Sequence, residues 1–242
     1  MNNFLFELCA ENLESAKAAE FGGASRIELC AELAIGGVTP SIELTTAVLR
    51  ALSIPVHVLI RPRGGNFVYS AEEFAVMQRQ VAQAKQAGAA GVVLGMLRPD
   101  CRVEVERSRA LVELAHPMTV TFHRAFDATP DLSEALEAVI ETGADCLLTS
   151  GGEPDVLAGA EAIRRLRTQA GERLSVMAGG GLRLANLVEV VQRTGVSLLH
   201  GSLTGERENE VGAKKPIVSV ADVREAVRLF SQEVAKRQAA AR

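Results

Sequence analysis

FGGASRIEL, residues 21–29, is the first of four stretches in which a glycine and a small residue come just before an apolar run. The others are QAGAAGVVL at 86–94, ETGADCLLT at 141–149 and RTGVSLLHG at 193–201. Such a glycine is typical of the left-handed residue that ends a helix, and the short apolar run after it is typical of a buried strand. Each stretch therefore predicts the end of a helix followed directly by a strand.

The same alternation extends outward over the whole chain. The predicted strands are residues 4–9, 26–31, 56–61, 91–94, 119–123, 146–150, 174–178 and 197–202, and amphipathic runs separate them. The four glycine-marked strands are the even-numbered ones, so the repeating unit is a double βα element of roughly 60 residues, which fits the alternating layers of a barrel interior.

Helix ends can also be located. Ser70 with Glu73 forms a capping box, and Thr129 before Pro130 predicts a second helix start. Glycines are expected to close the helices that precede strands, at Gly22, Gly88, Gly143, Gly171 and Gly195.

Eight βα pairs in 242 residues predict a single-domain (β/α)8 TIM barrel over residues 1–242. The alternative is a doubly wound open sheet, in which we would expect a pause where the strand order reverses. The even spacing has no such pause and favours the barrel.

The amino-acid composition limits the classes of partner and the cellular compartment that we expect. With 26 basic and 30 acidic residues, the net charge is −4, which gives no reason to expect nucleic acid or an anionic membrane as a partner. The four cysteines lie far apart and form no CxxC, so we expect a reducing cytoplasm. We expect no signal peptide and no membrane span, because the longest uncharged apolar stretch, residues 87–97, is shorter than the roughly 18 residues required.

Functional groups of such a barrel gather where the strands end. The first two predicted strands both end in ELC, at residues 7–9 and 28–30, and alternation places glutamate and cysteine on one face of each strand. If these faces point inward, Cys9 and Cys30 become cross-strand neighbours. Two such thiolates suit a soft ion such as Cu(I), whereas a closed zinc site requires four ligands. Alternatively, both cysteines are small buried apolar residues.

Glu7 and Glu28 require a partner inside a barrel, and Arg61 at the end of the third strand is the expected one. The two carboxylates could serve acid/base chemistry or hold a metal. The alternative is an ion-pair network that only stabilises the core. Arg61 and Arg63 flank Pro62 in a stiff basic turn suited to a carboxylate or phosphate, unless the turn is an ordinary surface loop.

The fifth predicted strand ends in TFHRAFD and brings His123, Arg124 and Asp127 to the rim. His123 is a candidate general base or metal ligand, or a hydrogen-bonded core histidine. His200 on the last strand is a further candidate.

The loops after the last three strands are rich in glycine and hydroxyl groups. Such loops bind phosphate through backbone N–H groups in many barrels, although tight turns require glycine in any case. The candidate ligand-binding residues there are Thr149, Ser150, Gly179, Gly180, Gly181 and Ser202.

Five segments resemble the CutC copper homeostasis family: RIELCAELAIGGVTPS, PVHVLIRPRGGNFVYS, VTFHRAFD, LLTSGG and VMAGGGLR. The resemblance implies a cytoplasmic (β/α)8 barrel, often a homo-oligomer, that binds Cu(I) through Cys9 and Cys30. Members of the family carry further cysteines where this chain has Ala10 and Val68. A third copper ligand would then come from Met177, His123 or solvent.

Two functions follow as hypotheses. The first is copper handling, with Cu(I) between Cys9 and Cys30. The second is an enzyme of unassigned reaction on a small anionic substrate, with the arginine turn and the glycine loops binding the anion. Glu7, Glu28, His123 and Asp127 would then supply acid/base groups.

Overall fold

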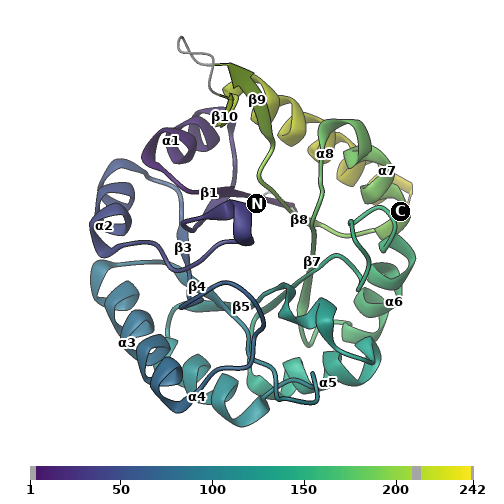
Figure 1. The fold of residues 1–242 in the computed structure, drawn as a ribbon. Helices are drawn as coiled ribbons and strands as arrows, with labels where there is room; N and C mark the ends of the chain where they lie inside the picture. The colour runs from purple at the N-terminus through teal and green to yellow at the C-terminus, as the bar shows by residue number, and fades with distance from the viewer. Residues whose placement is uncertain (1–3, 209–213, 241–242) are drawn as a thin grey trace.

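The computed structural model describes the backbone of residues 4–208 and 214–240 and the side chains outside residues 204–217. Eight parallel strands form a closed barrel in which β1 pairs with both β2 and β8 (Figure 1). This closure confirms the TIM barrel and excludes the open sheet. The strands are β1 Leu5–Ala10, β2 Arg26–Leu29, β3 Val56–Leu59, β4 Gly91–Leu94, β5 Thr119–Phe122, β6 Cys146–Thr149, β7 Ser175–Gly179 and β8 Leu198–Gly201.

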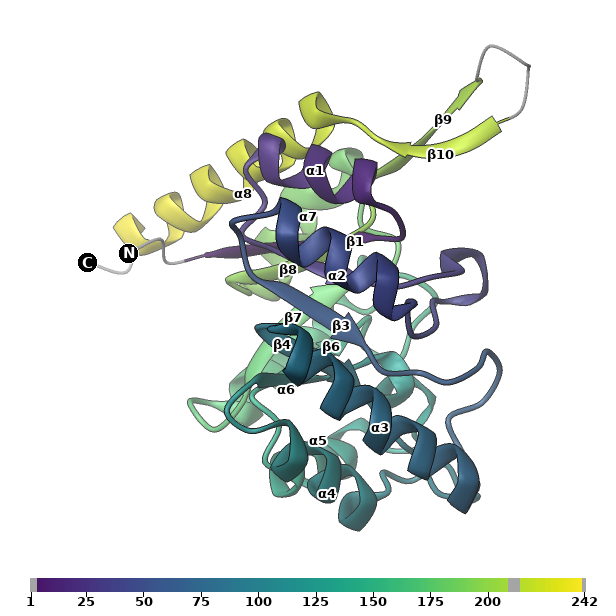
Figure 2. The same ribbon diagram turned by 90° about the vertical axis from the view of Figure 1, so that its left-hand side faces the viewer.

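Helices surround the barrel on the outside (Figure 1). They are α1 Leu13–Gly22, α2 Ile42–Ala51, α3 Ala71–Ala87, α4 Val105–Ala115, α5 Leu132–Thr142, α6 Ala160–Ala170, α7 Leu184–Thr194 and α8 Val220–Ala240, with short 3₁₀ helices η1 Leu33–Ile35 and η2 Arg124–Ala128. The β8–α8 connection contains an antiparallel hairpin, β9 Thr204–Glu208 and β10 Lys214–Val218, which the sequence pattern did not predict. It projects away from the ring (Figure 2).

Most predicted helix ends are confirmed, and two are wrong. The Ser70 capping box is present, and glycines with left-handed backbone end α3, α5 and α7. The predicted cap at Thr129 is wrong, because Asp131 caps α5 by accepting two backbone N–H groups. Gly22 lies inside α1, and Gly23 is the left-handed residue. A Cβ at Gly22 would lie 2.4 Å from Val223 Cβ, so this glycine permits α1 to approach α8.

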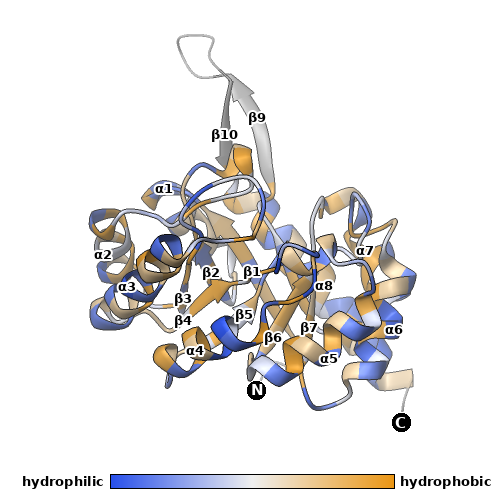
Figure 3. Ribbon diagram, turned by 60° about the horizontal axis from the view of Figure 1, so that its bottom comes forward, coloured by the Kyte–Doolittle hydropathy of each residue, from blue (hydrophilic) through white to orange (hydrophobic). Residues whose placement is uncertain are grey.

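The main hydrophobic core lies between the strands and the helices. Alternate residues of β1, including Phe6 and Leu8, point outward into this layer and are fully buried. Figure 3 shows the strands as mainly hydrophobic and the helices with mixed faces. Burying a side chain of this size stabilises the fold by about 1.5–3 kcal/mol, so this layer accounts for most of the apolar stabilisation.

The barrel interior is different, because it contains two small apolar clusters and a set of charged groups. One cluster is formed by Cys9, Cys30, Leu59 and Val93, and the other by Cys146, Leu148 and Met177. The other residues of β1, including Glu7, point into this interior. Branched apolar residues usually fill such interiors, so the charged groups indicate a function that depends on them.

Candidate metal centre and adjoining cavity

Two thiols meet at the carboxyl end of β1 and β2. The Sγ atoms of Cys9 and Cys30 lie 3.4 Å apart, and both residues are buried. The predicted cross-strand proximity is confirmed, although the register places Cys9 opposite Glu28. Both cysteines are free, so the sulfurs can act as ligands.

Glu28 and His200 add oxygen and nitrogen donors beside Cys9. Ligand atoms of Cys9, Glu28 and His200 all lie within 4.8 Å of one another. Glu28 Oε1 lies 3.9 Å from Cys9 Sγ, and Glu28 Oε2 lies 3.8 Å from His200 Nδ1. Together with Cys30, these residues offer two sulfurs, one nitrogen and one carboxylate from three neighbouring strands.

Glu7 binds and orients the His200 side chain. Its Oε1 lies 2.7 Å from His200 Nδ1, and its Oε2 accepts a hydrogen bond from Arg26 Nε. Glu7 is fully buried and Arg26 nearly so. The expected pairing of the carboxylates with Arg61 is therefore wrong. Arg26 is the partner, because it lies opposite Glu7 in the β1–β2 register.

Glu7, Glu28 and His200 differ widely in their pKa shifts. Burial raises the pKa of Glu7, but the hydrogen bond from His200 and the charge of Arg26 outweigh it and lower that pKa to about 2. Burial raises the pKa of Glu28 to about 7 against the charge of His200. The pKa of His200 is raised, because the two carboxylates outweigh its burial. The two glutamates are thus separated in their titration.

The Cys9 thiol is held protonated in the absence of a metal. Its hydrogen bond with Cys30, its burial and the nearby Glu28 carboxylate raise the pKa of Cys9 well above its usual value. A metal that binds there must displace protons.

The expected sources of a third ligand were Met177, His123 or solvent. Met177 instead contacts Arg26, whose Nη2 lies 3.7 Å from the thioether sulfur. His123 is not in the described group of ligand atoms, and His200 takes this place. Barrel closure places β8 beside β1, and this brings His200 next to Cys9.

A cavity of about 1070 Å³ opens above this group at the carboxyl ends of the strands. Several predicted site residues line it: Cys9, Glu28, Arg61, His123, Arg124, Asp127, Gly180, Gly181, His200 and Ser202. Others do not line it, namely Glu7, Cys30, Arg63, Thr149, Ser150 and Gly179. The acid/base roles expected of the carboxylates stay a prediction.

The arginines of the basic turn bind the protein itself. Arg61 donates to the backbone carbonyls of Ile35, Gly37 and Gly65 and stacks on the Phe67 ring. Arg63 pairs with the carboxylate that completes the α3 capping box. The structure therefore brings Arg61 to the cavity wall and leaves Arg63 outside it.

Asp127 organises the loop after β6. It accepts hydrogen bonds from the Thr149 hydroxyl, from the backbone N–H of Ser150 and Gly152, and from Arg124 Nε. Arg124 Nη2 also donates to the Ser150 hydroxyl. This network makes Thr149 and Ser150 supports of the rim rather than parts of the cavity surface.

His123 is a neutral hydrogen-bond donor on the cavity wall. Its Nδ1 accepts from the Ala125 N–H, so the proton of the neutral ring lies on Nε2, which is buried and has no hydrogen-bond partner among the described residues. Burial and the charge of Arg61 lower the pKa of His123 to about 3. The ring packs against Phe67, with centroids 5.1 Å apart.

The glycines at the end of β7 and just after it permit close packing. A Cβ at Gly179 would lie 2.7 Å from Leu148 Cδ1, and one at Gly180 would lie 2.9 Å from Arg124 Cζ. Gly180 has φ of 109°, a conformation that L side chains rarely adopt.

Sequence reasoning missed two residues of this region. Arg26 shares a strand face with Glu28, and the same alternation that paired Glu28 with Cys30 could have identified it. Arg183 lies two residues after the glycine run and lines the cavity, but no local pattern distinguishes it from a surface arginine.

Comparisons with known proteins agree on one family. The CutC family model matches residues 4–205. The human "Copper homeostasis protein cutC homolog" is 43% identical over 208 residues, covering 86% of this chain and 76% of that protein. A family protein CutC of Chromobacterium violaceum is 46% identical over 202 residues, covering 84% of this chain and 82% of that protein.

Comparison with solved structures leads to the same family. A crystal structure of a CutC protein of Streptococcus agalactiae has a TM-score of 0.78 and 34% identity, covering 83% of this chain and all of that one. Thiamine phosphate pyrophosphorylase of Pyrococcus furiosus, with a TM-score of 0.62 and 18% identity over 96% of this chain and 98% of that one, shares the fold alone. No helix among the described residues is long and apolar enough to cross a membrane. By sequence and by structure, the chain belongs to the CutC family.

Proposed function

We propose that this protein binds one Cu(I) ion between Cys9 and Cys30, with His200 and Glu28 supplying further donor atoms. The observation that carries the proposal is the pair of free sulfurs 3.4 Å apart, of which Cys9 lines the cavity, with both other donors beside Cys9. The human relative named for copper homeostasis supports it.

The sulfur separation suits one shared ion. Metal–sulfur bonds of about 2.3 Å place two ligands about 4 Å apart in a trigonal site, so the pair would separate by only a few tenths of an ångström. Thiolates are soft ligands that select Cu(I). A third donor would then complete a three-coordinate site.

His200 is well oriented to be the third copper ligand. Glu7 binds Nδ1 of His200 and so orients the ring, as carboxylates do around many metal-binding histidines. Cys9, Cys30, His200 and Glu28 also satisfy the ligand preferences of Zn²⁺, so the titration is repeated with Zn²⁺.

Binding is coupled to proton release. The pKa of the Cys9 thiol is raised by Cys30, burial and Glu28, so Cu(I) must displace thiol protons and its affinity rises with pH. The thiols must remain reduced to bind Cu(I), so we propose that the protein acts in a reducing compartment such as the cytoplasm.

The test is an anaerobic Cu(I) competition titration of the reduced protein against a chromophoric chelator. We expect the wild type to withdraw one equivalent of Cu(I) and Cys9→Ser/Cys30→Ser to withdraw none. Cys101→Ser is the matched control, because this free cysteine is exposed and belongs neither to the cavity lining nor to the group of candidate ligands. It should behave as the wild type.

Circular dichroism verifies that each variant is folded, and Cys30→Ser alone serves if the double variant is not. Equal competition by the wild type and the folded cysteine variant would contradict the proposal. Binding of Zn²⁺ without binding of Cu(I) would contradict it as well.

A further inference from the structure

The two cysteines of the proposed copper site differ in their access to the cavity. Cys9 lines the cavity, whereas Cys30 is fully buried and does not belong to the lining. A Cu(I) ion shared by the two sulfurs must contact both of them. An ion that enters through the cavity therefore meets Cys9 directly, and it meets Cys30 only after the groups that cover this residue have moved.

Leu33 is one of the side chains that cover Cys30. It packs against the apolar cluster around Cys9 and Cys30, and it also lines the cavity. Gly37 lies against the same cysteine, because a Cβ built on this glycine would lie 3.3 Å from Cys30 Cβ and 3.6 Å from Cys30 Sγ. Both residues belong to the segment 31–38, which contains η1 and which we call the cover loop. The cover loop separates Cys30 from the cavity.

Hydrogen bonds from two other parts of the chain hold the cover loop in place. Glu11, just after β1, accepts a hydrogen bond of 3.0 Å from the Leu33 N–H. Arg61, just after β3, donates through Nη1 to the backbone carbonyls of Ile35 and Gly37. These polar contacts keep Leu33 over the sulfurs, and water can replace them when the loop moves.

The backbone of the cover loop is suited to such a movement. Glu32 has φ of 52°, and Gly36 and Gly37 have φ of 87° and 81°, so left-handed residues lie on both sides of η1. This conformation is uncommon for a residue other than glycine and strains Glu32. Residues 34–36 are exposed, and segments with few buried apolar contacts open locally at low cost in free energy. The loop can therefore open while the barrel stays folded.

We propose that the cover loop is a gate, which opens to admit Cu(I) to Cys30 and closes again over the bound ion, and that Glu11 holds it closed. The inference rests on the proposed copper site and adds how the ion enters and leaves that site. Opening moves Leu33 away from the sulfurs. Because the loop is closed in both the free and the loaded protein, the gate sets the rates of copper transfer and not the equilibrium affinity.

The main test compares Glu11→Ala with the wild type. Loss of one hydrogen bond to a charged acceptor should populate the open loop about tenfold more. Stopped-flow transfer of Cu(I) from a chromophoric chelator to the reduced protein, and back, should then be about tenfold faster in both directions, at an unchanged equilibrium position. Glu11→Gln retains an acceptor oxygen and should have a smaller effect.

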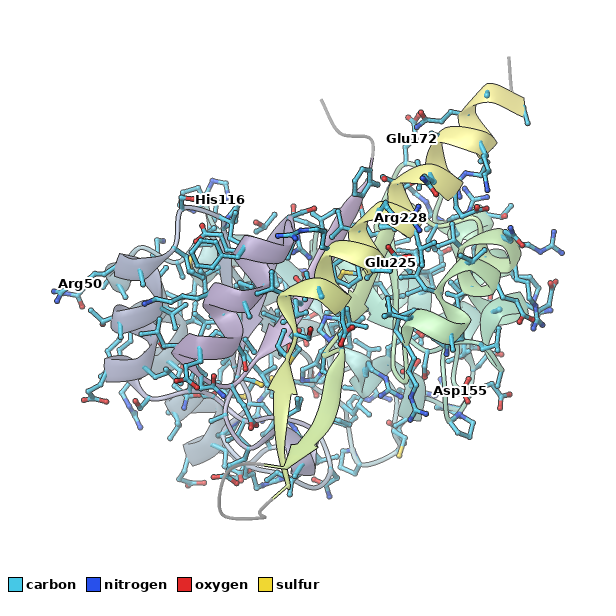
Figure 4. All side chains as sticks on the ribbon, turned by 90° about the horizontal axis from the view of Figure 1, so that it is seen from above. Arg50, His116, Asp155, Glu172, Glu225 and Arg228 are labelled. Atoms are coloured by element: carbon cyan, nitrogen blue, oxygen red, sulfur yellow. The ribbon has the colours of Figure 1, made fainter. Side chains whose placement is uncertain are left out.

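Glu172→Ala is the matched control, because it also removes one glutamate charge. Glu172 is exposed in the connection between α6 and β7, on the opposite side of the molecule from the β9–β10 hairpin (Figure 4). This variant should transfer Cu(I) at the wild-type rate.

Two further readouts require no metal. The N–H groups of Ala31 and Val38 bond to each other's carbonyls across the base of the loop, so their hydrogen exchange should be about tenfold faster in Glu11→Ala, with exchange in the barrel strands unchanged. Alkylation of Cys30 by iodoacetamide, located by mass spectrometry, should accelerate in Glu11→Ala. It should also accelerate in Leu33→Ala, which removes the covering side chain and leaves the hydrogen bonds in place.

The outcomes separate the gate from the copper site. Equal transfer rates in the wild type and Glu11→Ala, both binding Cu(I), would overturn the gate and leave the copper site standing. A weaker Cu(I) affinity of Glu11→Ala at an unchanged uptake rate would also overturn it, because Glu11 would then act on the site itself. Absence of Cu(I) binding by the wild type would overturn both proposals.

Discussion

Replacing Glu7 by glutamine should destabilise the fold and weaken the metal site together. Glu7 is fully buried and binds two cationic partners, Arg26 and His200. Glutamine has nearly the same shape but no charge, so it leaves the Arg26 guanidinium buried without a counter-charge.

The magnitude follows from this burial. Removing one member of a buried ion pair costs about 3–5 kcal/mol, and the remaining amide oxygen still accepts one hydrogen bond. We therefore expect Glu7→Gln to cost about 3 kcal/mol. For a domain of this size that corresponds to a loss of roughly 6–12 °C in Tm.

The assay is guanidinium chloride unfolding at neutral pH, followed by circular dichroism because the chain has one tyrosine and no tryptophan. Glu7→Gln, Arg26→Met and the double variant form a double-mutant cycle. The double variant should lose less stability than the sum of the singles, by about 2 kcal/mol. Cu(I) affinity of Glu7→Gln should fall about 10–100-fold, as expected when the orientation of a ligating histidine is lost.

A cost below about 1 kcal/mol for Glu7→Gln, or strict additivity in the cycle, would refute this account of the barrel interior. Unchanged Cu(I) affinity in the folded variant would refute the link between Glu7 and the metal ligand His200.

Three further predictions concern other parts of the fold. His57 and His123 are both buried, and their pKa values are lowered to about 4 and about 3. The unfolded chain therefore takes up these protons first, and below pH 6.5 each histidine should reduce the folding equilibrium constant about tenfold per pH unit. Unfolding titrations from pH 7 to pH 5 measure this slope, and His57→Gln should flatten it. Asp127→Asn should destabilise the loop after β6 by about 2 kcal/mol, seen as faster amide hydrogen exchange there with little change elsewhere. Gly22→Ala should cost about 1–3 kcal/mol in thermal unfolding, because a Cβ at Gly22 would overlap Val223 of α8; unchanged stability would contradict the packing described.

Local patterns were sufficient for the strands and most helix ends. The eight predicted strands correspond to β1–β8, because a short apolar run between turn residues is a local signal. The Thr129 cap failed because the helix begins two residues later, where Asp131 accepts from the Ser133 and Glu134 N–H groups, while the Thr129 hydroxyl donates to the Phe126 carbonyl. The β9–β10 hairpin was missed because the charged sequence of its strands lacks the apolar alternation of a packed strand.

The candidate site was only partly predictable. The repeated ELC placed Cys9 and Cys30 together, because alternation along two adjacent strands is itself a local property. Arg61 was the wrong partner for the carboxylates, since its side chain is held by backbone carbonyls. The position of an arginine at the end of a strand does not reveal which groups its long side chain will bind.

The sequence by itself thus determined the barrel, the two thiols and the glycine loops, each of which depends on contacts between near neighbours or on a repeated period. Only the tertiary structure decided that Glu7 binds His200, which lies 193 residues later, and that Arg183 shares a cavity with Cys9. The physical reason is closure. Hydrogen bonding of β8 to β1 joins the two ends of the chain, and no local pattern records which side chains meet across that seam.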